Sequence, residues 1–132
     1  MSERYLHHEL TEKISGHAME VHRILGPGFL EAVYEEALIL ELERAGFLCE
    51  SQREFSIQYK DITLKKKLRC DLVIENKIII ENKAVAETAS IDEVQLVSYL
   101  KASGLQVGLL FNFGTKSLLF KRKIFTGTKQ NE

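Results

Sequence analysis

The chain has 132 residues, of which 45% are hydrophobic and 28% charged, and its net charge is −1. This length fits one domain with its own core, and no run of about 18 apolar residues exists that could span a membrane. The N-terminal segment contains acids and lacks an apolar stretch, so it is not a signal peptide. Two cysteines, Cys49 and Cys70, are too few for a disulfide framework or a zinc cluster, and we expect reduced thiols in a cytoplasmic protein.

Two helices are predicted in the first third of the chain. In residues 9–25 apolar side chains recur at helical spacing, and Gly26-Pro27-Gly28 ends the helix. A second helix is predicted over residues 30–45, and the short connection favours an antiparallel pair. The side chains expected to line one face of this second helix are Leu30, Val33, Ala37, Leu38, Leu42 and Ala45.

The apolar pattern then changes to a period of two. It predicts strands over residues 55–59, 62–64, 68–74 and 78–85, with a turn at 75–77. Residues 90–102 return to helical spacing, with Ser90 as the N-cap and Glu93 as the acid of a capping box. The apolar positions expected in this helix are Ile91, Val94, Leu96, Val97 and Leu100.

Two further strands are predicted, over residues 107–113 and 118–125, and the polar tail from Thr126 is expected to be disordered. The predicted order is α-α-β-β-β-β-α-β-β. It indicates a single α/β (mixed α+β) domain over residues 1–132, with its core over about 10–125, in which helices flank a central mixed sheet.

The hairpin of residues 68–85 carries the most informative pattern. A turn centred on Asn76 pairs apolar residues with apolar residues on both faces, and it sets Asp71 opposite Glu81. Lys83 lies two residues farther along the same face, within reach of both carboxylates. Two opposed carboxylates repel each other unless positive charge joins them, so we expect Lys83 and a divalent cation to balance the site. A slip of one residue would send every side chain to the other face.

Carboxylate oxygens suit Mg²⁺ or Mn²⁺ rather than zinc. A bound cation of this kind lowers the pKa of its water and stabilises charge on a phosphoryl oxygen. A lysine beside it can orient the water or hold the phosphate, so Asp71, Glu81 and Lys83 have the parts for metal-assisted phosphodiester hydrolysis. The motif is short, and a structural ion-pair set that includes Arg69 is the alternative explanation.

The distribution of charge bears on the substrate. Residues 1–50 carry ten acids and four bases, a net charge of −6, whereas residues 51–132 carry fourteen bases and nine acids, a net charge of +5. Basic residues cluster at Lys65–Lys67 with Arg69, and again at Lys121–Lys123. A basic surface can follow a phosphate backbone, but on charge alone solvated strand faces are the favoured explanation.

Several segments carry a more specific signal. They are Glu20–Pro27, the G-x-x-E-x-x-Y pattern of Gly28–Tyr34, Arg69–Val73, Glu81–Val85, Gln95–Lys101 and Gly108–Gly114. Together they resemble the GxxExxY protein family, and the resemblance runs from about Leu10 to Ile124. That family is placed within the PD-(D/E)XK nuclease superfamily, which implies a restriction-endonuclease-like core and a Mg²⁺-dependent nuclease site.

The resemblance also implies roles for individual residues. Asp71 and Glu81 correspond to metal ligands, with the backbone carbonyl of Asn82 as a third, and Lys83 corresponds to the catalytic lysine. Glu31 resembles the helical acid that supports the metal or its water, and Gln95 resembles a catalytic glutamine. The residues expected to contact the substrate are Tyr99, Lys65, Lys67 and Arg69.

Two hypotheses follow for the function. The first is a metal-dependent nuclease acting on DNA, or less readily on RNA, with Mg²⁺ or Mn²⁺ as its cofactor. The alternative is a non-catalytic module that keeps the nuclease fold and binds nucleic acid or protein. A homo-oligomer, in which a second subunit covers apolar helix faces or completes a substrate channel, is compatible with either hypothesis.

Overall fold

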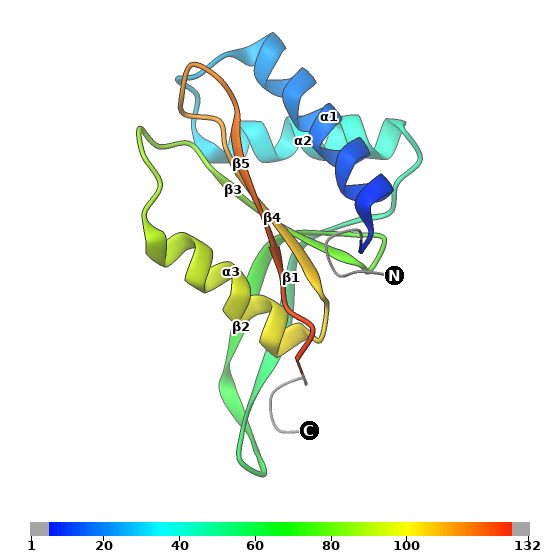
Figure 1. Ribbon diagram of the computed structural model, residues 1–132, viewed down its shortest axis with the longest axis vertical. Helices are drawn as coiled ribbons and strands as arrows, with labels where there is room; N and C mark the ends of the chain where they lie inside the picture. Colours follow the sequence, from blue (N-terminus) through cyan, green and yellow to red (C-terminus); the bar gives the residue numbers. More distant parts are fainter. Residues whose placement is uncertain (1–5, 128–132) are drawn as a thin grey trace.

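Within residues 6–127, which the structure describes, five strands form one mixed sheet in the order β1-β2-β3-β4-β5 (Figure 1). The structure is a computed structural model. The strands are β1 (Cys49–Tyr59), β2 (Ile62–Ile74), β3 (Ile78–Lys83), β4 (Val107–Asn112) and β5 (Leu119–Ile124). β3 and β4 run parallel, and the other neighbouring strands are antiparallel. The predicted mixed sheet is therefore confirmed.

Helices cover both faces of this sheet (Figure 1). α1 (His8–Leu25) and α2 (Glu31–Arg44) pack on the face that includes Ile78 and Ile80, and α3 (Ser90–Ser103) packs on the face that includes Ile79. β3 and β4 are buried on both faces, which explains the polar-free runs of residues 78–80 and 107–111. The mixed α+β fold with flanking helices is confirmed. In residues 6–127, no helix is long and apolar enough to cross a membrane.

The β2–β3 hairpin has the predicted register. Its turn places Glu75 and Asn76 at left-handed φ angles of 54° and 53°, a geometry that matches the natural twist of a hairpin. The paired residues are Leu72 with Ile80, Val73 with Ile79, and Ile74 with Ile78. Because apolar partners meet on both faces, any other register would bury polar side chains.

The strand boundaries differ from the prediction, since β1 begins at Cys49 rather than at residue 55 and β3 ends at Lys83 rather than at residue 85. Residues 62–64 and 68–74, expected as separate strands, form the single strand β2, because the intervening lysines of Lys65–Lys67 continue the extended backbone. These lysines are exposed, so the alternating pattern that marks a half-buried strand is missing there. The predicted disordered tail falls mainly on residues 128–132, which lie outside the described residues.

β1 and β2 continue beyond the rest of the sheet as a two-stranded ribbon of residues 55–69 (lower part of Figure 1). The ribbon has two chemically different faces. Phe55 and Leu68 lie opposite each other and belong to the core beneath α3. Because neighbouring residues of a strand alternate between faces, Lys67 and Arg69 lie on the opposite face, away from α3.

The buried face of α2 was predicted only in part. Leu30 and Val33, expected inside, are 79% and 38% exposed, whereas Tyr34, Leu38 and Leu42 are fully buried. These three residues are four apart, so they share one face of the helix. Tyr34 was not among the side chains expected to line this face. A tyrosine can nevertheless be buried when its hydroxyl finds hydrogen-bond partners.

α3 shows a similar departure. Leu96 and Leu100 are buried as expected, but Ile91 and Val94 are 64% and 57% exposed, and Tyr99 is buried in their place. Apolar residues occur on all sides of this helix, so periodicity cannot select the face that packs on the sheet.

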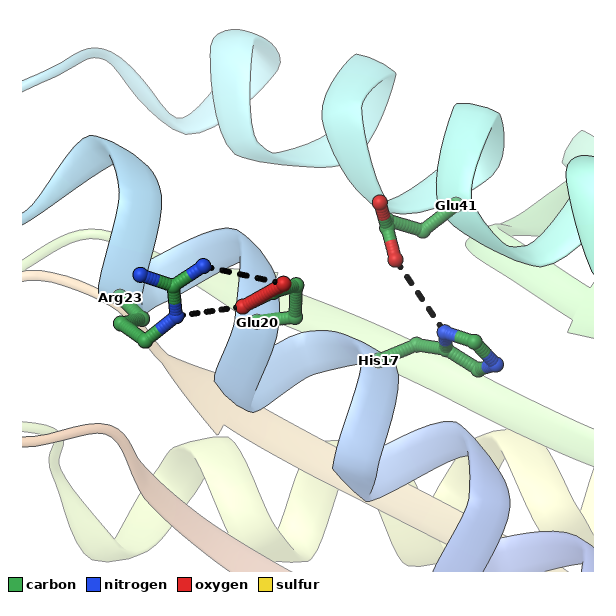
Figure 2. Close-up of polar contacts among 4 residues, drawn as sticks. All are labelled: His17, Glu20, Arg23 and Glu41. Carbon is green, nitrogen blue, oxygen red and sulfur yellow. Dashed lines mark hydrogen bonds and ion pairs between the residues drawn. The ribbon is translucent and has the colours of Figure 1, made fainter.

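α1 and α2 also make contact near the surface. Figure 2 shows the hydrogen bond between His17 Nδ1 and Glu41 Oε1, at 3.2 Å, which joins the two helices. Figure 2 also shows the ion pair of Arg23 with Glu20 within α1, with 2.6 Å between Arg23 Nε and Glu20 Oε1. Contacts of this kind near the surface contribute little stability. The buried face of α2 therefore holds the two helices in place.

Tyr34 fixes the loop that leads into α2. Its hydroxyl donates a hydrogen bond to the carbonyl of Gly26 at 2.5 Å and accepts one from the N–H of Phe29 at 3.1 Å. Its ring stacks on Phe113 with 4.7 Å between the centroids. One buried side chain thus ties both ends of the Gly-Pro-Gly loop to the core and sets the position at which Glu31 begins α2.

We predict that Tyr34→Phe destabilises the protein, because two backbone groups of the loop lose their partner. The expected loss is about 1–3 kcal/mol of unfolding free energy, measured by urea unfolding. Tyr59→Phe is the matched control, because Tyr59 lies at the tip of the ribbon and is 57% exposed. An equal and small effect of both substitutions would show that the Tyr34 hydroxyl does not hold the loop.

Candidate active site

Asp71 and Glu81 lie together at the end of the β2–β3 ladder. The N–H of Asp71 donates to Glu81 Oε2 at 2.8 Å, and the N–H of Asn82 donates to Asp71 Oδ2 at 2.8 Å. The last ladder pair before them is Leu72 with Ile80. Beyond it, each carboxylate binds the backbone of the other strand, and these crossed bonds fix both acids against the sheet.

Burial strongly perturbs these two carboxyl groups. Glu81 is only 6% exposed, and burial, followed by the nearby charge of Asp71, raises the pKa of Glu81 to about 8. Burial also raises the pKa of Asp71, although the hydrogen bond from the Asn82 N–H and the charge of Lys83 oppose that rise. Such perturbed acids that share a site are typical of functional positions.

Lys83 faces this acid pair from the end of β3. Its positive charge lowers the pKa of Asp71, Glu81 and Glu31, although burial outweighs it in each case. Its ammonium Nζ lies 3.9 Å from Asp92 Oδ1, and both side chains are partly buried. The ammonium group therefore stands between the acid pair and the first turn of α3.

Asp92 was missed in the sequence, where Ser90 and Glu93 were expected to cap α3. The N-cap is Ala89, and the N–H of Ala89 donates to Asp92 Oδ2 at 2.8 Å. Asp92 is the third residue of the helix, where an acid commonly caps the N-terminus. Ala89 has no side-chain oxygen that could cap the helix, so no capping pattern in the sequence indicated Asp92.

Glu31 lies at the start of α2 and is largely exposed. Burial, followed by the charge of Asp71, raises the pKa of Glu31, so its carboxyl group interacts electrostatically with the acid pair. Among residues 6–127, however, no three His, Cys, Asp or Glu side chains converge closely enough to hold a metal ion. Glu31 therefore stands beside the acid pair rather than in a closed three-acid cluster.

The two candidate residues of α3, Gln95 and Tyr99, lie in different surroundings. Tyr99 is only 7% exposed and belongs to the core beneath α3, and burial, followed by the charge of Glu81, raises the pKa of its phenol to about 12. Tyr99 thus packs behind Glu81. Gln95 lies one turn earlier and is exposed.

The loop after Lys83 is held by the end of β4. Asn112 Oδ1 accepts the N–H of Val85 at 3.1 Å, and Asn112 Nδ2 donates to the carbonyl of Val85 at 3.0 Å. A Cβ on Gly114 would lie 2.4 Å from backbone atoms of Val85, so only glycine permits this close approach. These contacts fix the backbone immediately after Lys83.

Asn82 is fully buried, and neither its side-chain Oδ1 nor its Nδ2 has a hydrogen-bond partner in the described part of the chain. A buried unpaired amide is destabilising. Asn82, between Glu81 and Lys83, therefore lowers the stability of the protein at a site that already buries charged side chains.

The acid pair has the chemistry of a site for a hard divalent cation. Burial raises the pKa of both carboxyl groups, and the charge of Asp71 raises that of Glu81 further, while the charge of Lys83 lowers both pKa values only in part. Carboxylate oxygens are preferred ligands of Mg²⁺ and Mn²⁺. Asp71 and Glu81 therefore fit such an ion, and the Asn82 carbonyl and Glu31 are the neighbouring oxygen groups.

Comparison with known proteins gives a family assignment. Residues 8–123 match the family model of the PD-(D/E)XK nuclease superfamily. The crystal structure of SSO0001 is similar, with a TM-score of 0.54 and 23% sequence identity. This match covers 96% of this chain and 62% of that chain, so the chain spans less than two thirds of SSO0001, and at this identity the likeness concerns the fold alone. No curated protein gives a significant match.

We predict that Glu81→Gln stabilises the metal-free protein at alkaline pH. The folded protein holds the Glu81 proton up to a pKa of about 8, against an ordinary value of 4.5, so wild-type stability falls as the pH rises between these values. Gln keeps an acceptor for the Asp71 N–H and removes the charge. The expected gain is roughly 2 kcal/mol at about pH 8.5 and little at about pH 4.5.

Urea unfolding with a chelator at both pH values measures this gain. Glu43→Gln is the control, because Glu43 is an exposed carboxylate at the far end of α2. A gain that is the same at both pH values would contradict the prediction, since it would not arise from the buried charge.

Proposed function

The chain belongs to the PD-(D/E)XK nuclease superfamily, and we propose that it hydrolyses phosphodiester bonds in DNA with Mg²⁺ or Mn²⁺ as its cofactor. The observation that carries this proposal is the buried pair of Asp71 and Glu81 with Lys83 beside it. A domain that only bound a partner would gain nothing from burying two carboxyl groups side by side, because their ionisation is unfavourable there and lowers its stability.

Each residue of the site has a distinct role in this proposal. Asp71, Glu81 and the backbone carbonyl of Asn82 hold the divalent cation. When bound, the cation supplies an acidified water and offsets charge on the phosphoryl oxygen. Lys83 binds a phosphate oxygen and orients the attacking water, while its contact with Asp92 limits the positions that its ammonium group can reach.

Two residues assist from the neighbouring helices. Glu31, at the start of α2, accepts a hydrogen bond from water at the site, because its carboxyl group lies within electrostatic range of Asp71. Gln95 is exposed on α3, one turn before Tyr99, and contacts the substrate strand. Tyr99 is buried in the core beneath α3, which leaves little of its side chain for contact with the substrate.

The finer family grouping is also a proposal. The three positions of the G-x-x-E-x-x-Y pattern each have a physical role here. Gly28 has a φ of 118° that favours glycine, Glu31 opens α2, and Tyr34 holds the loop between them. These roles support placing the chain in the GxxExxY family.

We predict that Asp71→Asn and Lys83→Ala each lower the rate of DNA cleavage with Mn²⁺ by roughly 100-fold or more, because each removes a group that acts on the reacting phosphate. A fluorescently labelled DNA, with the products resolved by electrophoresis, measures the rate. Glu43→Gln and Lys77→Ala remove the same charges at exposed positions outside the site, and we expect them to cut as wild type does.

Cleavage by Asp71→Asn at the wild-type rate would overturn the site assignment. The alternative, a binding module without activity, makes a different prediction. The wild-type protein would then give no heat with Mn²⁺ in calorimetry and would cut no DNA, although it would still bind DNA.

The ribbon supplies a surface for the substrate. Lys65, Lys67 and Arg69 are exposed, and the Arg69 guanidinium makes only a long contact to Glu54, at 3.8 Å between Nη2 and Oε2. Arg69 is two residues from Asp71 on the same strand. A phosphate backbone bound along this part of β2 would therefore lead directly to the acid pair.

We predict that Lys65→Ala combined with Lys67→Ala weakens DNA binding about tenfold at moderate salt and lowers the salt dependence of log Kd by about two. Fluorescence anisotropy in a chelator measures binding without cleavage. The control is Lys13→Ala combined with Lys77→Ala, which removes two exposed lysines remote from the ribbon. Equal binding by both double variants would exclude the ribbon as the substrate surface.

A further inference from the structure

Gln52 adopts an unusual backbone conformation next to the candidate active site. It lies within β1, yet its φ is 55°. This left-handed region is unfavourable for a residue with a long side chain and favours glycine or asparagine. Non-glycine residues in this conformation persist where the surrounding structure imposes it, and they cluster at functional sites.

The strained residue lies directly opposite Asp71. Ser51 pairs with Leu72, and Arg53 pairs with Cys70, so the register between these pairs sets Gln52 against Asp71. The two flanking residues of β2 also face different layers, because Cys70 packs beneath α3 and Leu72 packs beneath α1 and α2. In a regular strand residues two apart share a face. The strand pair is therefore irregular at Gln52 and Asp71.

This irregularity turns the Gln52 side chain toward α2. Gln52 Nε2 donates to both carboxylate oxygens of Glu35, at 3.3 and 3.1 Å. The register also sets this side chain against Asp71, and hydrogen bonding from Gln52 is one of the smaller effects that lower the pKa of Asp71 against the larger effect of burial. Glu35 is half-buried and lies one turn after Glu31 on α2.

The amide group suits this place chemically. Glu35 and Asp71 repel each other, since each carries a negative charge and the charge of Asp71 raises the pKa of Glu35. A glutamine amide has two N–H donors and no charge, so it can satisfy two carboxylates at once. Glycine would relieve the backbone strain, and asparagine would tolerate it, but neither side chain is long enough to reach α2.

We propose that Gln52 is a positioning residue, which holds the Asp71 carboxylate in place by linking it to Glu35 of α2. The catalytic consequence rests on the proposed function, because Asp71 is one of the two acids assigned to the metal. The positioning of Asp71 can be tested independently of that function, because the Asp71 carboxylate also accepts the N–H of Asn82. That amide therefore reports on the position of Asp71 in the absence of metal.

The test replaces Gln52 by glycine. We expect Gln52→Gly to leave the melting temperature unchanged or to raise it by a few degrees, because the strain is relieved. We also expect the Asn82 amide to exchange its hydrogen about fivefold faster in metal-free buffer, measured by NMR, because its acceptor becomes mobile. With Mn²⁺, the dissociation constant measured by calorimetry should rise about tenfold, as it does when the groups that orient a metal ligand are lost.

Lys60→Gly is the matched control. Lys60 also has a left-handed φ, of 57°, but lies in the turn at the tip of the ribbon. It should gain stability in the same way and leave both the Asn82 exchange and the Mn²⁺ affinity unchanged. Gln52→Glu is a second variant, with the same length but without donors, and should speed the Asn82 exchange as glycine does.

The outcomes separate this inference from the proposed function. If wild type binds Mn²⁺ and cuts DNA but Gln52→Gly leaves the Asn82 exchange within about twofold of wild type, the inference is wrong and the function stands. Equal acceleration of the ladder amides of Val73 and Ile79 would also overturn it, because the strands would then have loosened generally. If only the Asn82 amide responds and wild type binds no Mn²⁺, the positioning role stands and the nuclease proposal is wrong.

Discussion

The structure depends on one constraint, the crossed bonding of two acids to the backbones of facing strands. Asp71 and Glu81 each use a carboxylate oxygen to accept an N–H from the opposite strand. These bonds hold two like charges in a place where burial favours the neutral form of each acid. The arrangement is unfavourable in itself, so the stability must come from elsewhere. It comes from the isoleucines next to the hairpin turn, which are fully buried on the two faces of the sheet: Ile74, Ile78, Ile79 and Ile80.

The rest of the fold brings the carboxyl ends of β3 and β4 and the N-terminal ends of α2 and α3 to the same edge of the sheet. β3 and β4 run parallel, so their carboxyl ends lie together, which is the usual place for ligands in sheets of this kind. α2 begins there with Glu31, and α3 begins there with Asp92 in its first turn. The N-terminal ends of helices carry partial positive charge. Together with Lys83 they reduce the excess negative charge of the acid pair without removing it.

The sequence was sufficient where one local pattern determines the structure. The hairpin register follows from apolar residues that must meet on both faces, and the acid pair follows from that register. It was insufficient where contacts distant in the sequence decide. Tyr34 has helical spacing with Leu38 and Leu42, but the partners of its hydroxyl lie in the loop before α2, and helical spacing does not indicate them. The left-handed φ of Gln52 is opposite to the ordinary preference of glutamine, so only the facing Asp71 and Glu35 explain it.

The basic residues of the ribbon and Asp71 of the acid pair lie on one strand, β2, and this continuity argues for a shared role. Residues 62–70 contain four basic residues and no acid. Lysines on an unpaired strand edge also prevent edge-to-edge aggregation, and within residues 6–127 this part of β2 has no partner on the side where β3 pairs farther along, at Leu72–Ile74. Protection of an edge needs charge of either sign, however, so it does not explain the absence of acids. A polyanion that approaches a site rich in carboxylates must first be attracted by positive charge. Arg69 lies two residues before Asp71, so the positive charge that attracts the polyanion extends along β2 to the acid pair.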